Sequence, residues 1–182
     1  MEDISKNDQA LLADPVTERD HALGLPTAPI TIVEYGDYEC PSCLNAVPII
    51  KEVRQTLGDR LRFVFRHFPQ SSIHPHASAA AEVAEAAADQ GKFWPMHEAL
   101  FRHQSQLGEL DFSHLALTLG LEIYKFESSR AADKHRQRVR ADYESGLRSG
   151  VKKTPTLFIN GRRFDDPITA QAILTASSPS HR

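Results

Sequence analysis

The chain has 182 residues, of which 41% are hydrophobic, and a formal net charge of −3 at pH 7. A chain of this length forms about one domain and buries a substantial core. It has no long basic run, so nucleic acid is not an expected partner. It also has no apolar run of roughly 18 residues, so no membrane span is expected. The first residues lack the charged and apolar regions of a secretory signal, and we therefore expect a cytoplasmic protein.

The first third of the chain predicts a strand, a helix and a second strand. Residues 1–29 are polar and are expected to form an N-terminal arm or tail. Residues 30–35 are apolar and β-branched, as in a strand. Residues 41–57 carry apolar side chains at helical spacing, and Gly58 is a natural helix end. Residues 61–66 are the second strand, which completes a β-α-β unit.

The middle of the chain is predicted to be helical. Alanine, a strong helix former, dominates residues 74–89. Asp111 is a good N-cap for a helix that begins with the next residue. Further helices are expected at residues 93–104, 112–119 and 122–148, the last with a break near Ser128. These helices, at about residues 70–150, form an insertion between two halves of a sheet.

The chain then returns to strand character and ends in a helix. Residues 156–159 and 162–164 flank Asn160-Gly161, the dipeptide preferred in type I′ hairpin turns. Residues 167–175 are expected to form the last helix. The β-α-β half and this β-β-α half together predict one α/β domain over residues 30–182, with a central mixed sheet flanked by helices.

The only two cysteines lie in Cys40-Pro41-Ser42-Cys43, where the first predicted strand gives way to a helix. Such a pair is typical of a dithiol that cycles with its disulfide. In a helix its Cα atoms lie about 5 Å apart, within the range that a disulfide accepts. The positive end of the helix should favour the Cys40 thiolate. We therefore expect Cys40 to form a mixed disulfide with substrate, which Cys43 resolves.

The stretch from Val33 to Cys43 resembles the active-site region of the DsbA-like branch of the thioredoxin superfamily, a bacterial group with a helical insertion in the thioredoxin core. The resemblance covers roughly residues 28–175. It implies a thioredoxin-like fold and a protein thiol–disulfide oxidoreductase. It also implies that Pro155 is the cis-proline beside the dithiol, and that the backbone of Thr154 binds an extended substrate.

Four further positions near the dithiol carry expectations. Glu34 stands where the family keeps a buried acid, which implies a pKa raised by burial and proton transfer to and from Cys43. Pro41 and Ser42 are expected to tune the redox potential, because they set which groups meet the Cys40 thiolate. Glu39 is expected to raise the pKa of Cys40 by its negative charge.

The expected function is thiol–disulfide exchange as a cytoplasmic reductase or isomerase, without a cofactor or metal, because the cysteines carry the electrons. The expected partners are protein or small-molecule thiols and disulfides and a redox partner, but no nucleic acid and no membrane. The alternative is a non-catalytic module of the same fold that binds a metal or a peptide through Cys40 and Cys43. A zinc ion would then need further ligands, for which His74 and His76 are candidates.

Overall fold

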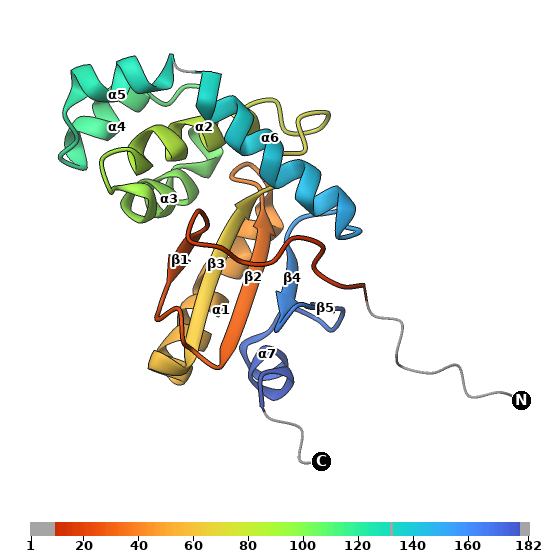
Figure 1. Cartoon of the computed structure of the whole chain (residues 1–182). Helices are drawn as coiled ribbons and strands as arrows, with labels where there is room; N and C mark the ends of the chain where they lie inside the picture. The colour runs from red at the N-terminus through yellow and green to blue at the C-terminus, as the bar shows by residue number, and fades with distance from the viewer. Residues whose placement is uncertain (1–9, 132, 179–182) are drawn as a thin grey trace, which may run out of the picture.

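The computed structural model describes residues 10–131 and 133–178. Their centre is a five-stranded mixed sheet in the order β1-β3-β2-β4-β5 (Figure 1). β2 and β3 are parallel and the other neighbours are antiparallel. The strands are β1 His21–Leu23, β2 Ile30–Gly36, β3 Leu61–His67, β4 Thr156–Ile159 and β5 Arg162–Phe164. The α-helices are α1 Pro41–Leu57, α2 Ala77–Ala88, α3 Phe93–Arg102, α4 Phe112–Thr118, α5 Ile123–Arg130, α6 Asp133–Arg148 and α7 Ala170–Ala176, with short 3-10 turns at Gly58–Arg60 and Gln104–Gln106.

The alternation of side chains along β2 gives the sheet two buried faces. Ile30 and Ile32 belong to the larger core, which includes the buried face of α1 and the inserted helices. Val33 and Tyr35 belong to a smaller core on the other side. Figure 1 shows α1 behind the sheet, and α6 and the N-terminal segment crossing in front of it. A strand buried on both faces explains why residues 30–35 are almost continuously apolar.

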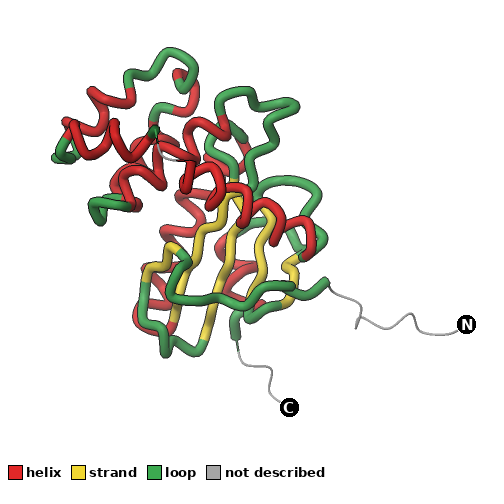
Figure 2. Tube along the Cα trace, turned by 45° about the horizontal axis from the view of Figure 1, so that its top comes forward, coloured by secondary structure: helices red, strands yellow, loops and turns green. Residues whose placement is uncertain are grey.

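The inserted helices α2 to α5 lie together at one end of the sheet, and α6 runs from them across the front of it (Figure 2). The predicted alanine-rich helix begins at Ala77 and not at residue 74, because the position before Pro75 disfavours helical backbone. Asp111 caps α4 as predicted and accepts bonds from two backbone N–H groups. The predicted long helix is divided into two, but α5 continues to Arg130, beyond the break expected near Ser128.

Residues 10–29, expected to be an arm or tail, lie against the sheet and supply its edge strand β1. In β1, His21 pairs with Phe65 of β3. Nearer the N-terminus, Leu11 forms an isolated bridge with Arg162 of β5. The buried guanidinium of Arg66 donates to the Asp20 carboxylate at 2.7 and 3.2 Å. It also donates to the carbonyls of Asp14 and Pro15. The sequence analysis did not predict β1, because three residues are too few to show an alternating pattern.

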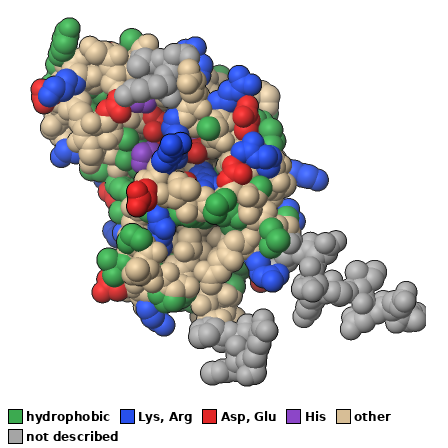
Figure 3. Space-filling model, in the orientation of Figure 1, with side chains coloured by type: hydrophobic (Ala, Val, Ile, Leu, Met, Phe, Trp, Pro, Cys, Tyr) green, Lys and Arg blue, Asp and Glu red, His purple; other side chains and the backbone are tan. Residues whose placement is uncertain are grey.

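Charges of both signs are interspersed on the face drawn in Figure 3. On α6, for example, Arg140 pairs with Glu144 one turn later at 2.7 Å. Within the described part of the chain, no helix combines the length and the apolar character needed to cross a bilayer.

Candidate active site

The two cysteines lie at the start of α1, where the chain turns out of β2. Cys40 is the N-cap residue and Pro41 is the first residue of the helix. Proline suits this position because its missing N–H would have no partner inside the helix. The Cys43 N–H donates to the Cys40 carbonyl at 3.0 Å, which closes the first turn. Both cysteines are free thiols, so this is the reduced dithiol.

Cys40 is held as the more acidic thiol. The pKa of Cys40 is lowered to about 5. The largest cause is the hydrogen bond from the Cys43 thiol, to which the Thr154 side chain and the backbone N–H groups of Cys43 and Ser42 add, against an opposing effect of burial. In its thiol form Cys40 Sγ also donates to the Thr154 carbonyl at 3.3 Å. At neutral pH the Cys40 sulfur is therefore a thiolate.

Cys43 has the opposite character. Its side chain is fully buried, and burial raises the pKa of Cys43 well above the ordinary thiol range. Its hydrogen bond to Cys40 and the negative charges of Glu34 and Cys40 raise the pKa further, against the Asp37 N–H, which lies 3.4 Å from the sulfur. Cys43 therefore stays protonated. The predicted roles of the two cysteines depend on this asymmetry.

Glu34 lies in β2 on the same side of the sheet as the larger core. Only 4% of its surface is exposed, and burial, with the charge of Cys40, raises the pKa of Glu34 to about 8. The carboxyl group is therefore mostly protonated at neutral pH. Its negative charge, when present, raises the pKa of Cys43, so the two groups interact electrostatically.

The loop before β4 lies beside the thiols. The Thr154–Pro155 peptide bond is cis. Strand pairing of Tyr35 with Thr156 places this loop next to the end of β2, from which the cysteines follow. The Thr154 hydroxyl donates to Gln70 Oε1 at 3.0 Å, so the loop is also tied to the segment after β3.

Asp37 organises the active-site loop and was not among the residues predicted from the sequence. Its buried carboxylate accepts hydrogen bonds at 2.8 Å from the backbone N–H groups of Glu39 and Gln70 and from His74 Nδ1. A carboxylate that accepts several bonds fixes the groups that donate to it. The available signal was an acidic residue directly after the strand and three positions before Cys40.

The pKa of Cys40 is lowered overall, and the causes of that shift do not involve Glu39, so the expected contribution of Glu39 stays a prediction. The Glu39 carboxylate accepts hydrogen bonds from the His76 backbone at 2.7 Å and from His76 Nδ1 at 2.8 Å. Burial would raise the pKa of Glu39, but these bonds lower it. His74 and His76 thus pair with Asp37 and Glu39, and the structure does not bring them to the thiols as further metal ligands.

The inserted helices also hold the start of α1. Gln104 Nε2 donates to the carbonyls of Tyr38 and Cys40 at 2.8 and 2.9 Å. Nothing in the local sequence identified Gln104, because its partners are backbone atoms more than 60 residues away. The site is therefore built by the sheet, the loop before β4 and the insertion together.

A groove of about 970 Å³ runs from the thiol end of α1 toward β5. It begins at Ser42, Thr154 and Pro155, and its walls combine apolar and charged side chains. Its other walls include Asn45, Ile49, Lys152, Lys153, Phe164 and Ile168. A substrate in this groove would lie next to the predicted substrate-binding loop.

A family model described as Thioredoxin matches residues 16–176. The chain belongs to the thioredoxin family. The thioredoxin-family chain is also 41% identical over 159 residues to the Na(+)/H(+) antiporter NhaA 3 of Salinispora tropica, and 44% identical over 161 residues to NhaA 1 of Mycolicibacterium gilvum. Each match covers 87% of this chain but only 24% and 26% of the relatives, so the chain spans about a quarter of their length.

Solved structures of DsbA type share the fold of this thioredoxin-family chain. BdbD from Bacillus subtilis has a TM-score of 0.78 at 22% identity, and the match covers 93% of this chain and 97% of that one. Wolbachia pipientis alpha-DsbA1 has a TM-score of 0.75 at 18% identity, covering 89% and 90%. Pseudomonas aeruginosa DsbA2 has a TM-score of 0.71 at 24% identity, covering 92% and 99%. The predicted thioredoxin-like fold is confirmed, and structures of DsbA proteins share it.

Proposed function

We propose that this chain is a thiol–disulfide oxidoreductase that works through Cys40 and Cys43. The observation that carries the proposal is the pairing of an acidic thiol at the start of α1 with a buried thiol of raised pKa. The first is ready to attack at neutral pH, and the second stays protonated until it is needed. This is the distribution that a two-step exchange requires.

In the reducing direction the Cys40 thiolate attacks one sulfur of a substrate disulfide. A bond forms between Cys40 and that sulfur, and the other substrate sulfur leaves as a thiolate. Cys43 then gives up its proton, for which we assign the ionised form of Glu34 as the acceptor, and attacks the Cys40 sulfur. The bond between Cys40 and the substrate breaks, and the substrate sulfur leaves as a second thiolate. Glu34 passes its proton to solvent and the substrate thiolates take up protons from water, so the products are a reduced substrate with two thiols and an oxidised protein with a Cys40–Cys43 disulfide. The reverse sequence oxidises a dithiol, and neither direction needs a cofactor.

The substrates that we propose are protein or small-molecule thiols and disulfides, together with a redox partner that resets the dithiol. An extended chain can lie in the groove, with its backbone against Thr154 and Pro155 and its sulfur at Cys40. Pro41 and Ser42 border the thiolate, and the Ser42 N–H is among the groups that lower the Cys40 pKa. These two residues are therefore assigned to tuning the potential.

We propose the reductase or isomerase direction in a cytoplasmic setting. Thioredoxin has a thiol pKa of about 7 and a reduction potential of about −270 mV. DsbA has a thiol pKa of about 3.5 and a reduction potential of about −120 mV. A Cys40 pKa of about 5 lies between them and predicts a potential of about −190 mV. Cytosolic glutathione at about −220 to −260 mV keeps such a dithiol mostly reduced. Equilibration in glutathione buffers tests this value, and a potential near about −120 mV would instead indicate an oxidant.

The test of the activity is trapping of the mixed disulfide. The Cys43→Ser variant, purified and mixed with a disulfide-bonded test peptide, should accumulate a covalent adduct that reductant releases. The matched Cys40→Ser variant should form none. If neither variant forms an adduct, or if both form it equally, the assigned roles are wrong.

The alternative is a non-catalytic module that binds a metal or a peptide through the same cysteines. Among residues 10–131 and 133–178, no group of three or more metal-ligating side chains includes Cys40 or Cys43. The alternative predicts that Cys43→Ser leaves function intact. It also predicts that the purified protein holds a stoichiometric amount of metal, bound through Cys40 and Cys43. Adduct formation by the Cys43→Ser variant would therefore count against it.

A second candidate for the substrate comes from the curated relatives. Those proteins are named Na(+)/H(+) antiporters, and this chain matches only about a quarter of them. We propose that a membrane transporter is one substrate of the dithiol. Trapping with the Cys43→Ser variant in a solubilised membrane fraction should then capture a transporter through Cys40, whereas capture of soluble proteins alone would contradict it.

A further inference from the structure

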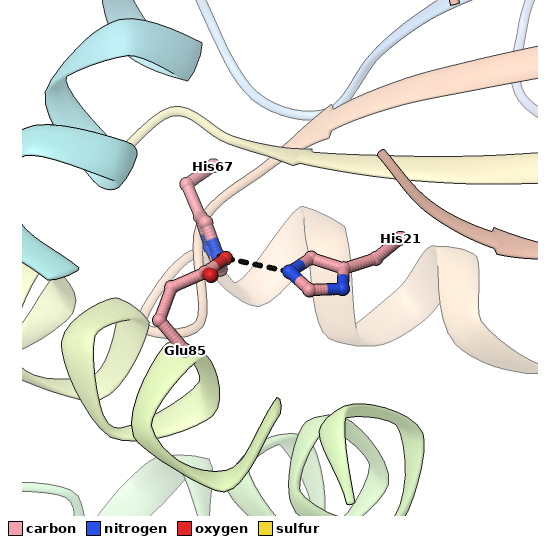
Figure 4. Close-up of side chains that lie close together, drawn as sticks. All are labelled: His21, His67 and Glu85. Carbon is pink, nitrogen blue, oxygen red and sulfur yellow. Dashed lines mark hydrogen bonds and ion pairs between the residues drawn. The ribbon is translucent and has the colours of Figure 1, made fainter. Parts of the chain in front are cut away.

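A second cluster of titratable side chains uses neither cysteine. It contains His21 of β1, His67 at the end of β3 and Glu85 of α2, which point toward one another (Figure 4). His21 Nε2 lies 2.7 Å from Glu85 Oε1, and His67 Nε2 lies 2.8 Å from the same oxygen. The potential ligand atoms all lie within 4.8 Å of one another. Three elements far apart in the sequence thus deliver two imidazole nitrogens and a carboxylate oxygen to one point.

The cluster is largely shielded from water. The exposed fractions of the side chains are 17% for His21, 1% for His67 and 8% for Glu85. The Glu85 carboxylate oxygen lies between the two imidazoles, at 2.7 Å from His21 Nε2 and 2.8 Å from His67 Nε2. A buried negative charge surrounded by imidazoles is an environment in which a divalent cation is stabilised.

His67 has an unused ring nitrogen. Its Nδ1 is buried and has no hydrogen-bond partner among the described residues, while its Nε2 faces Glu85. A neutral imidazole binds a metal through a nitrogen lone pair and carries its proton on the other nitrogen. At His67 this tautomer puts the proton on Nδ1 and breaks no existing hydrogen bond of that atom. The only bond lost is the one to Glu85, which the metal replaces.

We propose that His21 Nε2, His67 Nε2 and Glu85 Oε1 form a binding site for a divalent transition-metal ion, with zinc as the ion to test. Two histidines and one carboxylate are a common zinc ligand set, which leaves the fourth tetrahedral position to water. The more exposed His21 side chain marks the side on which this water would lie. The site is separate from the thiol chemistry.

The geometry requires a small opening of the cluster. Zinc bonds of about 2.0–2.1 Å in a tetrahedron place ligand atoms about 3.3 Å apart. The present separations of 2.7 and 2.8 Å must therefore increase by about half an ångström. The His21 ring is stacked on Phe93 with centroids 3.5 Å apart and an angle of 7° between the rings, so it can slide along that face. It also lies on a three-residue edge strand.

A bound ion would join the N-terminal segment to the sheet and to the insertion. His21 belongs to β1, His67 to β3 and Glu85 to the alanine-rich helix α2. An ion that binds the folded chain but not the unfolded chain raises the apparent stability of the fold. The expected signature is therefore a zinc-dependent rise in the midpoint of thermal unfolding.

The experiment uses full-length Cys40→Ser/Cys43→Ser protein, so that thiols cannot bind the ion. Titration of the metal-free protein with Zn²⁺ in a calorimeter should show one ion per chain and a higher unfolding temperature. His21→Gln in this background should weaken binding at least tenfold. His76→Gln is the matched control, because His76 also pairs with a carboxylate but belongs to no three-ligand group. No binding, or equal binding by the His21→Gln and control variants, would overturn the proposal.

A second measurement needs no further variant and so does not depend on the folding of His21→Gln. Long-range ¹H–¹⁵N spectra of the same double-serine protein report the protonated nitrogen of each imidazole. Zn²⁺ should shift the Nε2 resonances of His21 and His67 and leave both rings protonated on Nδ1. Unchanged resonances of these two residues at saturating Zn²⁺ would refute the site. Because neither cysteine is present, failure here leaves the thiol proposal standing.

Discussion

Replacement of Cys43 by alanine should raise the pKa of Cys40, because the Cys43 thiol makes the largest single contribution to its low value. The Cys43→Ser variant keeps a hydroxyl donor at the same place. The two variants remove the same reactive sulfur but differ in whether the Cys40 thiolate retains its neighbour's hydrogen bond. Comparing them isolates that bond from the effect of the helix end.

The size of the change follows from the charge of the acceptor. A hydrogen bond to a charged group contributes about 1.5–3 kcal/mol, which corresponds to about one to two pKa units. The pKa of Cys40, about 5 in the native dithiol, should therefore rise to about 6–7 in Cys43→Ala. In Cys43→Ser it should stay within about one unit of the native value. The remaining acidity comes from Thr154 and the backbone N–H groups at the start of α1.

The assay is the rate of alkylation by iodoacetamide as a function of pH, since only the thiolate reacts. Both single variants have one cysteine, so each curve reports Cys40 alone. Circular dichroism at each pH verifies that the fold persists. If Cys43→Ala reacts with the same midpoint as Cys43→Ser, the hydrogen bond between the sulfurs does not govern the acidity, and the reasoning about the site fails.

Three further predictions concern stability. The pKa of Glu34 is raised from 4.5 to about 8, so the stability that its protonated form contributes is present below pH 4.5 and is lost as the pH rises toward 8. Over that pH range the free energy of unfolding of Glu34→Gln, measured in urea, should rise relative to that of the wild type by as much as about 4 kcal/mol. Arg66→Ala leaves the buried carboxylate of Asp20 unpaired and should lower the free energy of unfolding by about 3–5 kcal/mol. The control Arg62→Ala removes only an exposed hydrogen bond to the Thr17 carbonyl and should lower it by less than about 1 kcal/mol. Gly146→Ala places a methyl group 2.6 Å from the Phe68 ring and should lower the unfolding temperature, with a loss of about 1–3 kcal/mol.

Each of these has a contrary outcome. Parallel pH–stability curves for the wild type and Glu34→Gln would mean that Glu34 titrates as an ordinary carboxyl. Equal losses in the two arginine variants would mean that the buried Arg66 does not hold the N-terminal segment. An unchanged unfolding temperature for Gly146→Ala would show that α6 can shift away from the sheet at no measurable cost.

The elements predicted correctly from the sequence are those with a strong local signal. The hairpin is one, because Asn160 and Gly161 adopt the positive φ angles, 49° and 79°, that a type I′ turn requires. The bounds of α1 are another, set by Pro41 at the first helical position and Gly58 at the C-cap. β1 was missed, since its existence depends on pairing with β3 and not on its own three residues.

The same distinction applies to the candidate site. The cysteines are visible as a motif, and a lowered Cys40 pKa is expected from its place at a helix start, although the largest cause in the structure is the hydrogen bond from the Cys43 thiol. Gln70 and Gln104 are not visible, because they act through single hydrogen bonds to residues that only the fold brings near. The partner of Glu39 is equally invisible in the sequence, because His76 lies 37 residues away and only the fold brings the two together.

The first described residue lies close to the groove. The carbonyl of Ala10 accepts a hydrogen bond from the N–H of Arg163, and Arg163 is itself one of the groove's lining residues. The N-terminal end of the described segment is therefore held at the rim of the path toward Cys40. Exchange assays should accordingly compare protein with and without a tag or fusion partner joined at this end, because added bulk at the rim would compete with substrate.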